Sequence, residues 1–258
     1  MGRNMSRRAR RRRKAFVLVF IEFVLAVVIV ASVLGAGAYF MCPIKELSVE
    51  GTDLYTADEI KNYILDDEYS GNAVYAFFKN KLFPKGDAEF IDSFDVKMTG
   101  LNSITIVCNE KKILGYIYQE DGKYVYFNHS GEIVEISETF VDRGYMKVEG
   151  VVCENPERGE KLPIGKEQIG YLTSLIKILN KNDLMPNVVS YDEDGRIILS
   201  YDTYNIALGS SVYLEEKIDR ALRILPQLDG MTGTLHLENY SSANTDIVFE
   251  KDSGEEEN

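Results

Sequence analysis

An uninterrupted apolar run near the N-terminus constrains this chain more than any other feature. Residues 15–40 read AFVLVFIEFVLAVVIVASVLGAGAYF and contain a single ionisable side chain, Glu22. As a helix, the run would be about 39 Å long at about 1.5 Å per residue, which exceeds a bilayer core of about 30 Å. Because only a helix satisfies all of its own backbone N–H and C=O groups in hydrocarbon, we predict a transmembrane helix over 15–40.

Charge is distributed very unevenly around that run. Residues 1–14 carry seven arginines and one lysine and no acidic residue. The basic residues next to the run are Arg10, Arg11, Arg12, Arg13 and Lys14. Cytoplasmic flanks carry the excess of basic residues, so we predict that 1–14 form a cytoplasmic tip that fixes membrane topology. The C-terminal part would then lie outside the cytoplasmic membrane.

Two features of the run leave alternatives open. Ala36-Gly37-Ala38 fits a signal-peptide cleavage site, although the apolar run before it is longer than the roughly 7–15 residues of a signal core. Glu22 lies two turns into the predicted helix, where an acidic side chain suggests an intramembrane contact with another helix. The same carboxylate could instead reach toward the arginines at the cytoplasmic surface.

The remainder of the chain is acidic. Residues 41–258 hold 21 of the 29 basic and 40 of the 41 acidic residues, a net charge of −19. That charge would repel phosphate, which excludes nucleic acid as a partner. Cys42, Cys108 and Cys153 form no close pair, and no CxxC or HExxH spacing occurs. We therefore predict neither a disulfide framework nor a metal site.

We predict that the chain is not an enzyme and uses no cofactor. His129 lies in a turn, and His236 alternates with leucines and so points to the wet face of a strand. No GxSxG or phosphate-binding GxxxxGKS/T pattern occurs. We interpret acid pairs such as Asp66-Asp67 and Glu215-Glu216 as solvated faces, because such pairs arise freely among 41 acidic residues.

Residues 43–112 indicate a small α+β domain in the order strand, helix, helix, strand, strand. Thr56-Ala-Asp-Glu59 is a capping box that begins a short helix. A second helix is expected over 73–83, with apolar residues at Val74, Phe77, Phe78 and Leu82. The expected strands cover 44–50, 94–98 and 104–107. Helices on one face of so small a sheet leave at least one strand edge unpaired.

Residues 113–250 indicate a mixed, β-rich domain with two helices. Asp-Gly and Ser-Gly turns separate its first strands. Amphipathic helices are expected over 166–180 and 214–228. The expected strands cover 115–119, 123–127, 132–136, 146–152, 188–191, 196–200, 204–208, 234–237 and 246–249. Residues 251–258 form an acidic tail. The predicted fold class is α+β, with one transmembrane helix before two domains.

Several segments resemble the FtsQ/DivIB family of bacterial cell-division proteins. Ile44-x-x-Leu47-x-Val49-x-Gly51 and Ile104-Thr-Ile106-x-x-x-Glu110-Lys111 are similar to the two ends of its POTRA (polypeptide-transport-associated) domain. Thr52 and Leu114 depart from that pattern. Matches to the family's β domain are Tyr126-Phe-Asn128-x-x-Gly131-x-Ile133, Ile206-x-Leu208-Gly209 with Glu216-Lys217, and Gly233-x-Leu235-x-Leu237. Their colinear order behind one membrane span carries the resemblance.

The resemblance implies a non-enzymatic scaffold that links division proteins at the septum and helps regulate septal peptidoglycan synthesis. It implies a single-pass type II protein of the bacterial cell membrane. The implied partners are FtsL-like and FtsB/DivIC-like bitopic division proteins and the septal penicillin-binding transpeptidase. A membrane-anchored extracytoplasmic sensor or ligand-binding module is the alternative, and it would require a closed apolar pocket with convergent polar groups.

The last expected strand, 246–250, offers a sheet edge to which another chain can add a strand. In the resembled family, partners add along this part of the β domain, and a tyrosine that contributes there falls near Asn239 or Tyr240. We predict partner contacts at Leu237, Tyr240, Ile247, Val248 and Phe249. A simpler interpretation assigns Ile247 and Phe249 to the core and leaves only Val248 outside.

Overall fold

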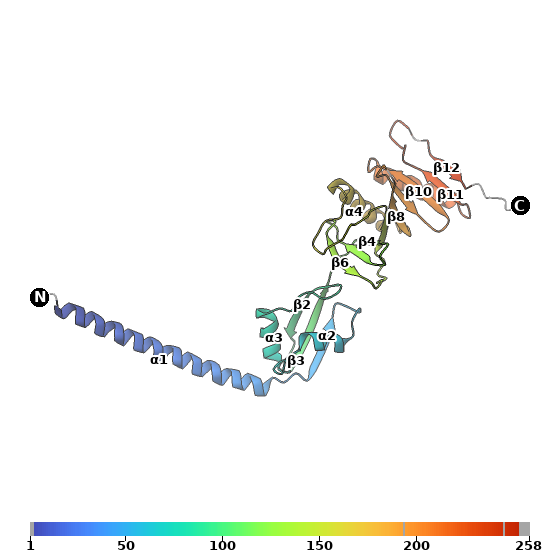
Figure 1. The fold of residues 1–258 in the computed structure, drawn as a ribbon. Coiled ribbons are helices and arrows are strands. Elements are labelled where there is room, and N and C mark those ends of the chain that lie inside the picture. Colours follow the sequence, from blue (N-terminus) through green and yellow to red (C-terminus); the bar gives the residue numbers. More distant parts are fainter. Residues whose placement is uncertain (1–2, 193, 245, 253–258) are drawn as a thin grey trace. The chain divides into compact units, whose positions relative to one another are not determined.

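The computed structural model describes residues 3–192, 194–244 and 246–252, with the side chains of 3–15, 38 and 39 outside that description. The chain divides between Glu110 and Lys111 into two units, which we describe separately (Figure 1). The predicted fold class, α+β with an N-terminal apolar helix and mixed sheets, is confirmed.

Helix α1 (Arg3–Met41) contains the apolar run. Its window Phe16–Gly37 has 22 residues and a mean hydropathy of 3.0, and none of the window is buried against the rest of the protein. At about 1.5 Å per residue the window is about 33 Å long, which is enough to cross a bilayer core. Glu22 lies exposed within it. The side chains of Arg10–Lys14 fall outside the described residues.

The rest of the first unit contains β1 (Glu46–Glu50), α2 (Ala57–Ile64), α3 (Ala73–Leu82), β2 (Ile91–Met98) and β3 (Ser103–Glu110). This is the predicted order of elements. The sheet order is β1-β3-β2, with β1 parallel and β2 antiparallel to β3. Strands β2 and β3 are longer than the apolar pattern indicated, because their ladder continues into polar residues at their ends.

The predicted capping box at the start of α2 is confirmed. The Thr56 N–H donates to Glu59 Oε2 at 2.8 Å, and the Glu59 N–H donates to Thr56 Oγ1 at 3.3 Å. Two otherwise unpaired N–H groups of the first helical turn are thereby satisfied. The core below the helices consists of residues from α2, α3, β2 and β3, and Leu47 and Val49 of β1 pack against it. Its members include Ile60, Ile64, Ala73, Phe94, Ile104 and Ile106.

The second unit is built on one nine-stranded mixed sheet in the order β12-β11-β10-β9-β8-β7-β4-β5-β6. Its strands are β4 (Gly115–Tyr118), β5 (Tyr124–Phe127), β6 (Ile133–Ser137), β7 (Met146–Glu149), β8 (Val188–Tyr191), β9 (Ile197–Ser200), β10 (Tyr204–Gly209), β11 (Gly233–His236) and β12 (Val248–Lys251). The pairs β10/β11, β4/β7 and β7/β8 are parallel, and the others are antiparallel.

Two helices pack their apolar sides into the core of this unit. Helix α4 (Lys166–Lys181) buries the five predicted residues, Ile169, Leu172, Leu175, Ile176 and Leu179. Helix α5 (Leu214–Ile224) ends four residues before the predicted boundary, and the 3-10 turn η1 (Leu225–Gln227) follows it. Pro226 explains the early end, because proline has no backbone N–H for the helical ladder.

Two buried lysines lie in segments that match the FtsQ/DivIB pattern. Lys111 Nζ donates to Glu135 Oε2 at 2.8 Å, and both side chains are buried, with exposures of 6 % and 5 %. Lys217 Nζ donates to the Leu208 carbonyl at 2.7 Å and to the Ser210 carbonyl at 3.0 Å. Burial lowers the pKa of Lys217. Both lysines therefore have a structural role that accounts for their place in the pattern.

Asp66 and Asp67 lie at the surface, with side-chain exposures of 41 % and 31 %, and they are also ion-paired. Lys79 Nζ lies 2.6 Å from Asp66 Oδ1 and 2.7 Å from Asp67 Oδ2, so one ammonium group holds both carboxylates.

The cysteines pack as free thiols: Cys42 and Cys108 are buried in the first core and Cys153 in the second.

Candidate partner-docking surface

The large sheet ends in two strands with different surroundings. At one edge, the start of β6 is covered by backbone, because the Ile133 N–H donates to the Glu160 carbonyl and the Gly159 N–H donates to the Ile133 carbonyl, both at 2.8 Å. At the other edge lies β12, which pairs with β11 alone among the described strands (Figure 1). An edge strand with unpaired backbone groups is a template for an added strand.

The hydrogen-bond pattern shows which backbone groups of β12 face outward. The Asp252 N–H donates to the Thr232 carbonyl at 3.2 Å, in register with Glu250 opposite Thr234 and Val248 opposite His236. Hydrogen-bonded pairs alternate along an antiparallel ladder, so the residues between these pairs direct their N–H and C=O groups away from β11. Phe249 and Lys251 are those residues.

The side chains of β12 alternate between the core and the open face of the sheet. Phe249 lies opposite the fully buried Leu235, and Phe249 and Ile247 both pack partly buried against the core. Val248 is 59 % exposed on the other face. The strand begins at Val248 instead of Asp246 and takes up Lys251, which the sequence assigned to the acidic tail.

Leu237 occupies a different place from the other predicted contacts. Its side chain is 0 % exposed, because it lies in the core directly after β11. A partner cannot reach it while the core is intact, so Leu237 supports the sheet from inside and does not belong to the surface. Of the predicted contact residues, Val248 offers the most exposed side chain.

Tyr240 lies in the segment between β11 and β12 and not in a strand. Its ring meets that of Tyr213 edge-on, with centroids 6.2 Å apart, and the Arg220 guanidinium lies 5.9 Å from its ring centroid. The Tyr213 hydroxyl is 3.3 Å from the Ser242 hydroxyl. Sequence reasoning missed Tyr213 and Arg220, since both belong to the α5 region and their sequence spacing from Tyr240 carries no signal.

His236 links the last two strands on the open face. Its Nδ1 is 2.8 Å from Glu238 Oε1, and its Nε2 is 3.2 Å from Glu250 Oε2 on β12. The hydrogen bond with Glu238 raises the pKa of His236, and Glu250 adds to this effect. The sequence placed His236 on the wet face but gave no sign of this ion-pair bridge to the edge strand.

The other candidate chemistries concern metal ligands, the second histidine and the surface hollows. Among the residues that the structure describes, no three His, Cys, Asp or Glu side chains gather as metal ligands. The backbone of His129 is bound to α4, because its carbonyl accepts a hydrogen bond from the Thr173 hydroxyl at 3.2 Å. A hollow of about 730 Å³ beside β4 is lined by charged residues such as Asp121 and Lys123 as well as by Ile117. Its mixed lining differs from the closed apolar pocket that a ligand-binding module would need.

Comparison with known proteins finds a bacterial cell-division protein that is similar to part of the chain. No protein-family model matches the chain. Over 154 residues, the chain is 24 % identical to the cell division protein DivIB of Clostridium tetani, and the matched stretch covers 58 % of each chain. The chain resembles the FtsQ/DivIB family. It spans about 58 % of the length of the DivIB that it matches, so a role for the whole protein is a matter of proposal.

Two residues of the FtsQ/DivIB-like segments, Gly233 and Lys217, have clear structural roles in this chain. Gly233 has a φ of +153°, and a Cβ on it would collide with the Glu250 carbonyl of β12. Glycine therefore lets the edge strand approach β11 closely. Lys217, from the Glu216-Lys217 match, holds the carbonyls at the turn after β10. The FtsQ/DivIB-like residues thus shape the end of the sheet that carries β12.

Proposed function

We propose that this chain is a non-enzymatic, single-pass membrane protein of bacterial cell division. In this proposal α1 anchors it in the cytoplasmic membrane with the N-terminus inside, and both units lie outside the cytoplasm at the division septum. There it links division proteins and helps regulate septal peptidoglycan synthesis. The similarity to DivIB and the apolar length of α1 support the proposal.

The observation that carries the linking role is the unpaired edge of β12. A partner segment in extended conformation would hydrogen-bond to the outward backbone groups of Phe249 and Lys251 and extend the sheet. Val248 and Tyr240 would then contact partner side chains at the open face and at the adjoining loop. The partners proposed are FtsL-like and FtsB/DivIC-like bitopic proteins and, through them, the septal penicillin-binding transpeptidase.

Site-specific photocrosslinking in dividing cells tests this role. A photoreactive residue at Val248 of the full-length chain should crosslink to a bitopic division protein. Val152 is a matched control, since it is also an exposed valine of the second unit but lies in a loop. Crosslinks of equal yield from both positions, or crosslinks only from Val152, would rule out β12 as the docking strand.

Membrane anchoring has its own test. The intact mass of the protein extracted from membranes should include the whole of α1, and a thiol-reactive label that cannot cross membranes should reach a cysteine introduced at Glu154 in whole cells. The native cysteines are buried and give a low background. A mature chain that begins after Ala38 would identify the run as a cleaved signal peptide and end the anchoring proposal.

A further inference from the structure

Helix α3 buries two alanines and presents several large apolar residues to the outside. Ala73 and Ala76 face the core, with exposures of 0 % and 3 %. Phe78 and Leu82 are exposed by 53 % and 66 %, and Phe83, directly after the helix, by 75 %. The usual pattern of a surface helix is the reverse, with the large apolar residues inward. We refer to Phe78, Leu82 and Phe83 as the α3 apolar face.

The side chain of Asn80 on α3 holds the helix in this orientation through two hydrogen bonds to strand β2. The Asn80 side-chain amide donates to the Phe94 carbonyl at 3.1 Å, and its Oδ1 accepts from the Val96 N–H at 3.0 Å. This half-buried amide pairs with both a carbonyl and an N–H of β2, and the two hydrogen bonds fix the rotation of the helix about its own axis. The exposure of the α3 apolar face is therefore built into the fold.

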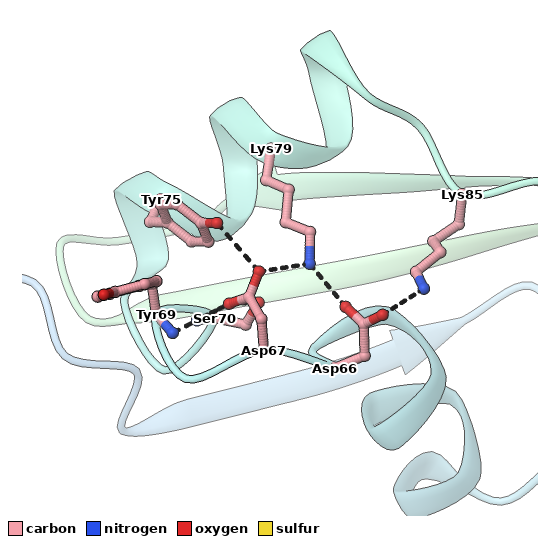
Figure 2. A network of polar contacts seen from close by, with 7 residues as sticks. All are labelled: Asp66, Asp67, Tyr69, Ser70, Tyr75, Lys79 and Lys85. Atoms are coloured by element: carbon pink, nitrogen blue, oxygen red, sulfur yellow. Dashed lines mark hydrogen bonds and ion pairs between the residues drawn. The ribbon is translucent and has the colours of Figure 1, made fainter.

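A network of charges holds the other flank of α3, as Figure 2 shows. Lys79 lies between Asp66 and Asp67, the Tyr75 hydroxyl donates to Asp67 Oδ2 at 3.0 Å, and Lys85 after the helix pairs with Asp66. The lysine at the centre lowers the pKa of both carboxylates, that of Asp66 to about 2. Asp66, Asp67 and Lys79 stay charged at neutral pH, and their contacts keep α3 in place.

The start of α3 is bound to the residue that follows the apolar helix. The Ala73 N–H donates to the Cys42 carbonyl at 2.9 Å, and the Ile44 N–H donates to the Gly71 carbonyl at 2.8 Å. Helix α1 ends at Met41. A helix of ten residues is about 15 Å long, so every residue of α3 lies within about that distance of the end of α1.

That position is the membrane surface if α1 spans the bilayer, so this inference rests on the proposed anchoring. The apolar window ends at Gly37, and the bilayer with its headgroups is about 40–45 Å thick, which places residues 38–42 in the headgroup layer. Aromatic residues and lysines are enriched at this level, where rings insert and ammonium groups stay in water. Lys81 accompanies the α3 apolar face in this way, with its Nζ 5.7 Å from the Phe77 ring centroid.

We propose that the α3 apolar face docks on the outer surface of the cytoplasmic membrane. Phe78, Leu82 and Phe83 insert into the boundary between headgroups and acyl chains, and Lys81 remains at the phosphate level. The first unit is thereby held against the lipid by a second contact in addition to its covalent link to α1. The ligand is a lipid surface, not a protein.

A tryptophan reporter tests this directly, because the chain contains no tryptophan. Full-length single variants Phe78→Trp, Leu82→Trp, Val248→Trp and Val28→Trp are reconstituted in phosphatidylcholine nanodiscs whose lipids are unbrominated, brominated near the headgroup, or brominated near the end of the acyl chain, the depth expected for Val28. Val248 matches Phe78 in exposure, at 59 % and 53 %, but lies in the second unit. Val28 reports on insertion of α1.

We expect brominated lipid to quench Phe78→Trp and Leu82→Trp at least twofold more strongly than Val248→Trp. Quenching of Val28→Trp without preferential quenching of the two α3 reporters would overturn membrane docking while leaving the anchor in place. A blue-shifted α3 reporter that brominated lipid does not quench would mean that protein covers the face, which also overturns the proposal. Loss of quenching at Val28→Trp would overturn the anchoring and the docking together.

Discussion

The Lys79 ammonium donates a 2.7 Å hydrogen bond to Asp67, and this contact joins α3 to the turn that precedes it. The carboxylate also accepts hydrogen bonds from Ser70 and Tyr75. The Asp67 carboxylate thus organises the segment between α2 and α3. Its ion pair with Lys79 helps α3 to keep its orientation, and protonation of Asp67 at low pH would weaken that pair.

Acid should weaken the first unit through this network. The pKa values of Asp66 and Asp67 are lowered by Lys79, so both carboxylates contribute stability above the ordinary aspartate value of about 3.9 and lose it as the pH falls through their lowered pKa values, about 2 for Asp66. Near-UV circular dichroism of the full chain in detergent should show reduced thermal stability below pH 4. Asp67→Asn should reduce this pH dependence, and the exposed Asp92→Asn should not. Equal acid sensitivity in both variants would contradict the account.

Removing one partner of the buried pair Lys111–Glu135 should lower the unfolding free energy much more than replacing both partners by apolar residues. Lys111→Met removes the nearest cation from a carboxylate of 5 % exposure, which still accepts from the Ile136 N–H and lies 3.7 Å from Arg158. We expect a loss of about 3 kcal/mol in unfolding free energy. The double variant Lys111→Met with Glu135→Leu should recover most of that loss. Urea unfolding curves measure both. Additive losses in the double variant would argue against a coupled pair.

His236 should titrate above its ordinary value of about 6.5, because Glu238 and Glu250 favour its protonated form. A raised pKa in the folded state gives stability that is present at low pH and is lost as the pH rises through the folded value. The bridge from β11 to β12 should therefore be weaker at pH 8 than at pH 6. NMR of the His236 ring, assigned with a His129→Gln variant, gives the midpoint. Glu238→Gln should lower that midpoint, and a midpoint at or below 6.5 in the unaltered protein would contradict the bridge.

Gly233→Ala should detach the edge strand. The added Cβ would meet the Glu250 carbonyl, and a φ of +153° is strained for alanine. Hydrogen exchange of a peptide covering 246–252 should become faster, while the core strands keep their protection. Gly170→Ala is the matched control, since a Cβ there meets nothing within 4 Å in the middle of α4. Unchanged exchange in Gly233→Ala would mean that β12 does not depend on this close approach.

Local patterns predicted the order of elements because each pattern has a local physical cause. The capping box at Thr56 and the apolar stripe of α4 appear in the structure as expected. Boundaries moved where the determining group was a backbone partner from another strand, as at the ends of β2 and β3, or a proline such as Pro226. Sequence periodicity carries no information about those partners.

The candidate site was less accessible to prediction. The sequence could indicate a final strand, but not that β11 covers one side of it or which of its N–H groups face outward. It grouped Leu237 with Val248, although one is buried and the other exposed. The sequence predicted an apolar-rich helix over 73–83 but not which of its residues face outward. The exposures of Phe78 and Leu82 show their direction, and the contacts of Asn80 and Lys79 hold the helix in it.

The outward N–H of Lys251 offers the most direct test of the linking role. Lys251→Pro removes this donor and leaves the ladder to β11 intact, whereas Lys251→Ala keeps the donor and removes only the side chain. The extracytoplasmic segment of the FtsB/DivIC-like partner is titrated against each full-length variant in nanodiscs, and the Kd of each complex is measured. We predict that Lys251→Pro weakens binding by about tenfold or more, the loss of about one backbone hydrogen bond, while Lys251→Ala stays within about twofold of the unaltered protein. Equal affinities for the two variants would contradict strand addition at β12.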